Sequence, residues 1–499
     1  MIYLVTTQDS LFPSTIYSRL SSEEAVKKVE SFDVIQLDSE TLGRDPHLVP
    51  ILTLQLGNDA QQCRIVIDAT TIDITIFKHA LENKLCVGHN LKFDLQFLYK
   101  HKIIPTHVFD TMVVEQLLHL GYNNKFFRYN LHDTAARYIP GLDIDKSVRG
   151  EIIWRGLDER TIQYAATDVV YLEKLMHLEE EACKKANCVQ GMRLENEFVP
   201  VIAYLEWCGI KLDVDKWKQK MQSDADNAKT AEEALNNWIK TAAKSDKFFQ
   251  KYIDPQLDLF DPEPKILLNW SSAQQLIPIF QHLGFDTKVQ DKETGMLKDS
   301  ISDKVIAKQK GINDELLKLF FGKGNPDDED YYAGYQGATK VVSTYGQSYL
   351  NAINPYTGRI HTNFKQLGAA SGRMACGSKQ KNTDLSKVNH CEAGYPQLQN
   401  LPADEATRGA FVPEKGNLMC SCDYSALESR LGADIYNEQE MLNEYLYGSQ
   451  DIHSLTAKIC FPHELQGIDV KDIKKLRPDL RKKAKGPEFK RTPYIEIYM

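Results

Sequence analysis

The stretch that decides the fold of the first part of the chain is DVIQLDSET, residues 33–41. Its alternation predicts a β-strand, because successive side chains of a strand point to opposite faces. Ile35 and Leu37 then face a hydrophobic core, whereas Asp38 and Glu40 share the other face. Two carboxylates on one face of a strand make this segment a candidate site for metal or acid–base chemistry.

Further strands and helices are predicted on both sides of this strand. Residues 21–30, SSEEAVKKVE, indicate a helix that begins with a capping box of Ser21 and Glu24. Later helices are expected after residue 90 and as one continuous segment over 158–178, DERTIQYAATDVVYLEKLMHL. Additional strands are predicted at 50–56 (PILTLQL), 63–68 (CRIVID) and 84–90 (KLCVGHN).

Two of these helices add acidic groups to the candidate site. Asp94 follows Asn90 by four residues, and Asp168 follows Tyr164 by four, so each pair shares a helix face. Converging carboxylates repel one another unless cations lie between them. Mg²⁺ prefers such oxygen ligands, and two divalent ions about 3.5–4 Å apart can activate water and stabilise a leaving oxygen. The acids therefore predict a two-metal site that cleaves phosphodiesters.

The order of the segments IQLDSET, GHNLKFDLQFL and YAATD resembles the DEDD exonuclease family in its tyrosine variant, whose fold is similar to that of ribonuclease H. The resemblance covers residues 1–185 and implies a 3′–5′ exonuclease with two Mg²⁺ ions, for which Mn²⁺ can substitute. It implies that Tyr164 positions the nucleophile and that Asn90 contacts DNA. The metal ligands that it implies are Asp38, Glu40, Asp94 and Asp168.

Bulk composition narrows the class of protein. The 499 residues suggest about three domains, and 42% hydrophobic and 26% charged residues are ordinary for globular proteins. Neither a spanning apolar run nor a signal peptide is evident, so we expect a cytoplasmic protein of a bacterial or phage-infected cell.

The net charge of -9 argues against non-specific coating of nucleic acid. Ten cysteines without a CxxC pair favour free thiols over a zinc site.

The second half contains further patterned segments. Residues 194–213, LENEFVPVIAYLEWCGIKLD, predict an amphipathic helix that ends at Gly209. Residues 416–436, GNLMCSCDYSALESRLGADIY, predict a strand that places Asp423 at its end, followed by a helix that Glu428 opens. Residues 480–489, LRKKAKGPEF, place two cations and a ring on one helix face, although Gly486-Pro487 discourages a continuous helix.

These segments, with GRIHTNFKQLGAASGRMAC (358–376) and YPQLQNLP (395–402), follow one another in an order that resembles family A DNA polymerases of the bacterial DNA polymerase I type. The resemblance implies a partial right-hand polymerase over 190–499, with a thumb-like part at about 220–335, a palm at 340–435 and the start of the fingers at 436–499. It implies that Asp423 binds Mg²⁺. The DNA contacts that it implies are Thr362, Arg373, Gln397, Gln399 and Asn400, and the dNTP contacts are Glu428, His453, Arg481, Lys485 and Phe489.

The resemblance ends after Phe489, where the chain reads KRTPYIEIYM. The segment that carries the second metal-binding carboxylate of the polymerase has no counterpart, and we expect no preceding 5′-nuclease domain. The sequence therefore predicts an incomplete polymerase region. An interrupted gene, a complementing polymerase fragment on another chain and a DNA-binding remnant stay open as explanations.

Together these observations predict an α/β protein: a ribonuclease H-like exonuclease domain joined to a partial right-hand polymerase. The expected function is Mg²⁺-dependent proofreading of the 3′ end in DNA replication. Its partners would be primer–template DNA, a single-stranded 3′ end and dNTPs. A non-catalytic primer–template binding protein and an RNA trimmer similar to ribonuclease D remain alternatives.

Overall fold

The structure is a computed structural model in which the described residues form two compact units. The first unit comprises residues 1–368 and 373–415, and the second comprises 369–372 and 416–499. The side chains of Lys485 and Phe489 lie outside the described residues. The described residues are 1–122, 127–140, 148, 151–254, 264–291, 295–309, 311–323, 332–377, 395–448 and 451–491, with side chains described up to 484.

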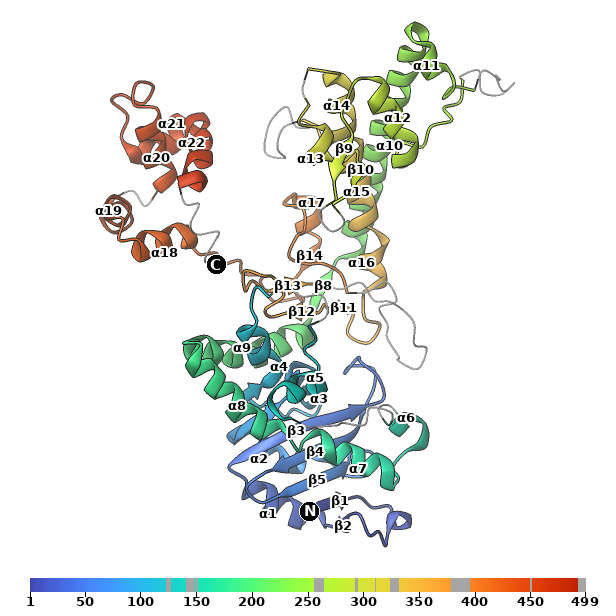
Figure 1. Ribbon diagram of the computed structural model, residues 1–499, viewed down its shortest axis with the longest axis vertical. Coiled ribbons are helices and arrows are strands. Elements are labelled where there is room, and N and C mark those ends of the chain that lie inside the picture. Colours follow the sequence, from blue (N-terminus) through green and yellow to red (C-terminus); the bar gives the residue numbers. More distant parts are fainter. Residues whose placement is uncertain are drawn as a thin grey trace. The chain divides into compact units, whose positions relative to one another are not determined.

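Within the described residues of the first unit, seven strands form one mixed sheet in the order β2-β1-β5-β4-β3-β6-β7. Figure 1 labels β1 to β5 of this sheet. The central strands β3, β4 and β5 are antiparallel, whereas β6 and β7 continue the sheet in parallel beside β3. The four strands predicted from sequence are confirmed, and β1, β2 and β7 are additional. The strands are β1 (Ile2–Val5), β2 (Ser18–Arg19), β3 (Val34–Thr41), β4 (Ile51–Asn58), β5 (Cys63–Asp68), β6 (Leu85–Gly88) and β7 (Val108–Asp110).

Helices pack on this sheet and enclose its core. Ile35 and Leu37 are buried as expected, and Val199 and Ala203 of the helix that follows the domain join the same apolar cluster. The capping box of Ser21 and Glu24 is present. The helices are α1 (Ser22–Glu30), α2 (Lys78–Asn83), α3 (Leu91–Lys100), α4 (Thr111–Leu118), α5 (Leu131–Tyr138), α6 (Glu151–Arg155), α7 (Glu159–Asp168), α8 (Leu172–Lys185) and α9 (Val189–Cys208).

The prediction of one continuous helix over 158–178 is wrong, because α7 ends at Asp168 and α8 begins at Leu172. The break falls at Val169-Val170, two β-branched residues that favour helices less than their neighbours do. Val169 is fully buried and packs in one cluster with Leu172 and Met176. The turn therefore lets the chain bury this valine while Asp168 ends its helix at the candidate site.

The remainder of the first unit is largely helical. The 32-residue helix α10 is anchored at its start, where Trp217 donates a hydrogen bond to the Gly346 carbonyl at 3.1 Å. Ser272 precedes α12 without a capping bond from its side chain, and the Gln275 side chain accepts a hydrogen bond from the Asn269 backbone N–H. The helices are α10 (Val214–Ser245), α11 (Lys247–Gln250), α12 (Ala273–His282), α13 (Asp303–Ile306), α14 (Asp314–Phe321), α15 (Gly334–Thr344), α16 (Gln347–Asn351) and α17 (Glu405–Arg408).

Short strands link the end of α9 to the later segments. Gly209 ends α9 as predicted, and β8 (Ile210–Leu212) then pairs with both β11 (Arg359–Ile360) and β14 (Phe411–Val412). A second pair joins β12 (Phe364–Lys365) to β13 (Ala375–Cys376), and a third joins β9 (Lys288–Gln290) to β10 (Leu297–Asp299).

The second unit contains five helices in its described residues, and two predictions for it are wrong. Residues 413–426 form no strand, because they are largely exposed and have no neighbouring strand to satisfy their backbone groups. The last helix runs through Gly486-Pro487 without interruption, as helices α9 and α12 accommodate Pro200 and Pro278. The helices are α18 (Leu427–Ile435), α19 (Gln439–Tyr447), α20 (Ile452–Cys460), α21 (Val470–Leu476) and α22 (Pro478–Arg491). Among the described helices of both units, none combines the length and apolar character that crossing a bilayer requires.

Candidate active site

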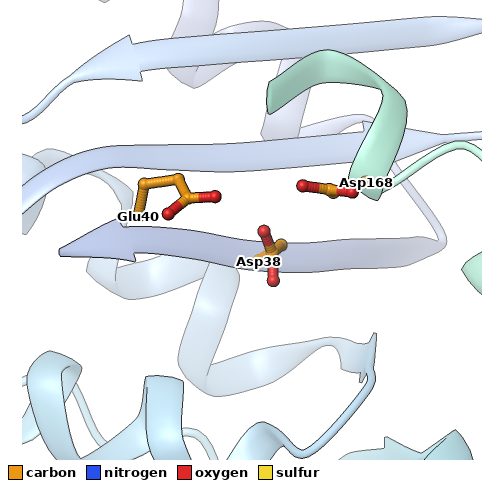
Figure 2. Close-up of side chains that lie close together, drawn as sticks. All are labelled: Asp38, Glu40 and Asp168. Carbon is orange, nitrogen blue, oxygen red and sulfur yellow. The ribbon is translucent and has the colours of Figure 1, made fainter. Parts of the chain in front are cut away.

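Three carboxylates converge above the central strand of the sheet (Figure 2). Asp38 and Glu40 come from β3 and Asp168 from the end of α7, and one oxygen of each lies within 4.8 Å of the others. All three side chains are half-buried. Because like charges this close repel one another and their oxygens are hard donors, the cluster fits a divalent cation of the Mg²⁺ or Mn²⁺ type.

The cluster lies in a pocket of about 940 Å³. Tyr164, one turn before Asp168 on α7, contributes to its wall, and its role in positioning the nucleophile stays a prediction. Part of the wall comes from far along the chain, from residues 361–363 and Tyr395. Other lining residues include Asp94, His89, Asn90, Phe93, Trp154 and Leu172.

Asp94 lies in the same pocket but stands apart from the three-carboxylate cluster. Its carboxylate accepts a 2.6 Å hydrogen bond from the Ser39 hydroxyl. Burial, with smaller contributions from Asp110 and Glu40, raises the pKa of Asp94 to about 7. The described structure thus brings together three of the four predicted ligands and holds the fourth against β3.

Asp110 is a fully buried carboxylate at the starts of α3 and α4 and is not among the predicted site residues. Its carboxylate accepts hydrogen bonds from the backbone N–H groups of Asn90 at 2.9 Å, Leu91 at 2.8 Å and Met112 at 3.0 Å. One fully buried side chain therefore caps both α3 and α4, and burial raises its pKa to about 6. An aspartate directly before an apolar helix is a helix-capping signal that could have identified it.

Asn90, the predicted DNA contact, stands at the start of α3 with a left-handed backbone (φ 65°). Asparagine tolerates this conformation better than most residues. The turn redirects the chain from β6 into α3, and Asn90 lines the pocket. Its position is compatible with a contact to substrate, and the contact itself stays a prediction.

Four of the predicted DNA-contact residues in the first unit also make hydrogen bonds within the chain. The Thr362 hydroxyl donates to the Pro396 carbonyl at 2.7 Å, and the Gln399 side chain donates to the Met374 carbonyl at 3.0 Å. The carbonyls of Gln397 and Asn400 accept from Tyr349 and Tyr345. These bonds involve the segments 362–377 and 395–400, and the role of the four residues and of Arg373 in DNA binding stays a prediction.

In the second unit, Asp423 and Glu428 are exposed, and Glu428 lies in the first turn of α18 as expected. The Arg481 guanidinium makes a two-pronged ion pair with Asp451, at 2.8 and 2.9 Å. Burial acts to raise the pKa of Asp451, but hydrogen bonds from Arg481 and Ser454 bring it below its ordinary value. Asp451 caps the start of α20, and His453 lies in the first turn of that helix. Their predicted contacts to a nucleotide stay predictions.

Comparisons with known proteins match both halves of the chain. Residues 13–180 match the family described as 3′-5′ exonuclease, and residues 266–491 match DNA polymerase family A. DNA polymerase I of Aquifex aeolicus is 26% identical over 462 residues, covering 88% of this chain and 66% of that protein. DNA polymerase I of Caldicellulosiruptor bescii is 36% identical over 159 residues, which is 31% of this chain and 16% of the relative.

The fold is similar to a solved structure described as the POL domain of Pol1 from M. smegmatis in complex with DNA primer-template and dNTP. The TM-score is 0.64 at 18% identity, covering 98% of this chain and 70% of that one. This similarity confirms the predicted fold class. The chain spans less than two thirds of the length of the curated relatives described above. The chain thus matches the 3′-5′ exonuclease family over residues 13–180 and DNA polymerase family A over residues 266–491, and bacterial DNA polymerase I proteins are among its homologues.

Proposed function

We propose that the N-terminal domain is a metal-dependent 3′–5′ exonuclease that removes nucleotides from the 3′ end of DNA and serves proofreading in replication. The observation that carries this proposal is the cluster of Asp38, Glu40 and Asp168, whose oxygens lie within 4.8 Å of one another. The cluster sits in the domain that matches the 3′-5′ exonuclease family.

In this proposal, different residues of the pocket bind the metal ions, orient the attacking water and contact the substrate. Asp38, Glu40 and Asp168 hold Mg²⁺, with Asp94 as the further ligand that the sequence predicts. When bound, two such ions supply a hydroxide nucleophile and stabilise the leaving oxygen. The hydroxyl of Tyr164, one helical turn from Asp168, orients the attacking water. Asn90 contacts the terminal nucleotide at the pocket entrance.

DNA is favoured over RNA as the substrate because residues 266–491 match a DNA polymerase family. A primer–template whose 3′ end is unpaired would then be the physiological substrate. An RNA trimmer would use the same carboxylates, so the substrate must be compared directly.

The decisive experiment incubates the purified chain with Mg²⁺ and a 5′-labelled primer annealed to a longer template, beside single-stranded DNA and RNA. We expect progressive shortening of DNA from the 3′ end, abolished by EDTA. Asp38→Ala should lower the rate by at least about 100-fold, since it removes a metal ligand. Glu181→Ala, which changes an exposed acid on α8, is the matched control and should digest like the parent. Undiminished digestion by Asp38→Ala would refute the proposal.

We also infer that the polymerase-family region binds primer–template and dNTPs and is a DNA-directed DNA polymerase. The match of residues 266–491 to DNA polymerase family A supports this role. Asp423 would bind Mg²⁺, while Glu428, His453, Arg481, Lys485 and Phe489 would face the dNTP. Adding dNTPs to the same assay tests this: primer extension supports polymerisation by this chain. Extension only after addition of a complementing polymerase fragment supports polymerisation that needs a second chain. Salt-sensitive binding without turnover would identify a non-catalytic primer–template binding protein.

A further inference from the structure

Glu206 on α9 is a buried carboxylate that joins three distant segments. Only 6% of its side chain is exposed. Its Oε1 accepts from Lys92 Nζ at 2.8 Å and from the Phe364 backbone N–H at 2.6 Å. Its Oε2 accepts from Gln96 Nε2 at 2.8 Å. A buried charge held in this way is compensated, and removal of a partner leaves the remaining charge without compensation.

Lys92 completes the same arrangement from the side of α3. An ammonium group has three donors, and here all three are used. Besides Glu206, Lys92 Nζ donates to Asn363 Oδ1 at 2.8 Å and to the Phe364 carbonyl at 2.6 Å. Two of its three acceptors therefore belong to a segment about 270 residues later in the chain. We call Glu206, Lys92, Gln96, Asn363 and Phe364 the Glu206 latch.

The latch borders the same pocket as the acidic cluster, but it holds a face of α3 other than the one that carries Asp94. Lys92 and Gln96 are four residues apart and share one face of the helix. Asp94 is two residues from each, about 200° around the helix, and accepts a hydrogen bond from Ser39 on β3. Because the latch holds one face of α3 and the opposite face carries Asp94, the latch is one of the contacts that set where the Asp94 carboxylate lies relative to β3.

We propose that Glu206 is a positioning residue of the exonuclease site, which sets α3 and its Asp94 carboxylate by tying the helix to residues 363–364. The inference rests on the proposed exonuclease function. It makes the geometry of the nuclease pocket dependent on a segment that follows α9, so that a change in the position of residues 363–364 would move the Asp94 carboxylate through α3.

Glu206→Gln keeps the size of the side chain but removes its charge and converts one acceptor into a donor. Lys92 then has three neutral acceptors and no charged partner, and the new amide NH2 faces the donor of Gln96, so α3 is held less tightly. We expect kcat on a 5′-labelled single-stranded oligodeoxynucleotide to fall about tenfold or more. KM should stay within about threefold, because the pocket wall is retained. Lys92→Met should behave alike, and Lys92→Arg, which keeps the cation, should recover part of the loss.

Three measurements on the full chain separate positioning from general damage. The first is kcat and KM for each variant, with the double variant Glu206→Gln/Lys92→Met, which should be no worse than the poorer single variant, since both act through one interaction. The second is oligonucleotide binding in EDTA, which should be unchanged. The third is the melting temperature. Lys211→Met and Glu414→Gln break a 2.7 Å ion pair that likewise joins distant segments, and they should digest like the parent.

The outcomes are distinct. A fall in kcat with unchanged binding in EDTA and a non-additive double variant supports the inference. Parent-like kcat in Glu206→Gln and Lys92→Met, or an equal fall in Lys211→Met, overturns it while leaving the exonuclease proposal intact. If Glu206→Gln does not fold, Lys92→Met alone decides between these results. A parent chain that does not digest DNA overturns the proposed function and this inference with it.

Discussion

At the scale of single residues, the site depends on carboxylates with different tasks. Asp38, Glu40 and Asp168 present oxygens to a common space, whereas Asp110 is fully buried and accepts from backbone amides at the starts of two helices. The first group is suited to hold cations and the second to hold the backbone. Residue type and spacing alone do not separate these tasks, because all four are acidic residues within or beside apolar segments.

Asp110→Asn tests the structural task. The amide keeps the shape but has one oxygen acceptor in place of two, so at least one buried N–H of Asn90 or Leu91 loses its partner. We expect a loss of stability on the order of 1–3 kcal/mol and slower digestion, because α3 starts less firmly. Thermal melts and the nuclease assay measure both. Asp73→Asn, which changes an exposed helix cap, is the control and should lower stability less. An equal loss of stability in the two variants would contradict the structural task of Asp110.

At the scale of elements, the close approach of α3 to the sheet depends on Gly88 at the end of β6. A methyl group there would lie 2.3 Å from the Leu91 side chain and 2.9 Å from the Leu37 carbonyl. Leu37 directly precedes Asp38 on β3, so crowding at Gly88 pushes both α3 and the strand of the active site. The sequence shows this glycine, but the approach becomes visible only when strand and helix are placed together.

Gly88→Ala should therefore destabilise the chain by about 1–3 kcal/mol, as overpacking of a core does, and lower exonuclease activity. Gly191→Ala is the matched control, because a methyl group there meets only Leu117 at an ordinary 3.5 Å and improves helix propensity in α9. Melting temperatures and digestion rates of both variants measure the effect. Equal behaviour of the two variants would show that the approach at Gly88 is not tight.

The elements also show how far sequence patterns reach. The alternation in 33–41 and the spacing of Tyr164 and Asp168 predicted the strand and helix face that carry the acids, because both periods are local. The amphipathic pattern continues without interruption across Val169-Val170, so it did not predict the break between α7 and α8. The strand before Asp423 was also predicted from local pattern, but a strand needs a partner, and residues 413–426 have none in the described structure.

At the scale of the whole molecule, contacts between distant segments were beyond the sequence. Asn354 donates to Asp45 at 2.8 Å across 309 residues, and Lys92 reaches Asn363 across 271. Periodicity identifies which face of an element is buried but not which remote face covers it. The polar partners of Glu206 and the distant part of the pocket wall could therefore be found only in the folded chain.

Stability of the folded chain should depend on pH through Glu179, a fully buried side chain on α8. Burial, with Glu115 and Asp110 nearby, raises the pKa of Glu179 well above 4.5, although Arg137 acts to lower it. The folded chain then binds this proton more tightly than the unfolded chain, so stability falls as pH rises above about 4.5 towards the folded pKa. Glu179→Gln removes this dependence, which amounts to at most about 1.4 kcal/mol per pH unit.

Melting temperatures of the parent and of Glu179→Gln between pH 5 and pH 8 measure this effect. We expect the melting temperature of Glu179→Gln to rise steadily relative to that of the parent as the pH rises. Glu181→Gln, an exposed position on the same helix, should follow the parent at every pH. A constant difference between Glu179→Gln and the parent would show that Glu179 titrates normally.

The length of α10 has a mechanical consequence. Its 32 residues span about 48 Å, and its first turns are pinned by Trp217 to Gly346 and by Lys220 to Tyr345. Its later residues, among them Trp238 and Ile239, belong to a separate apolar cluster with Phe280 and Phe320. The start of the helix is therefore fixed beside residues 345–346, and a tilt of about 10° at that point would displace its far end by about 8 Å.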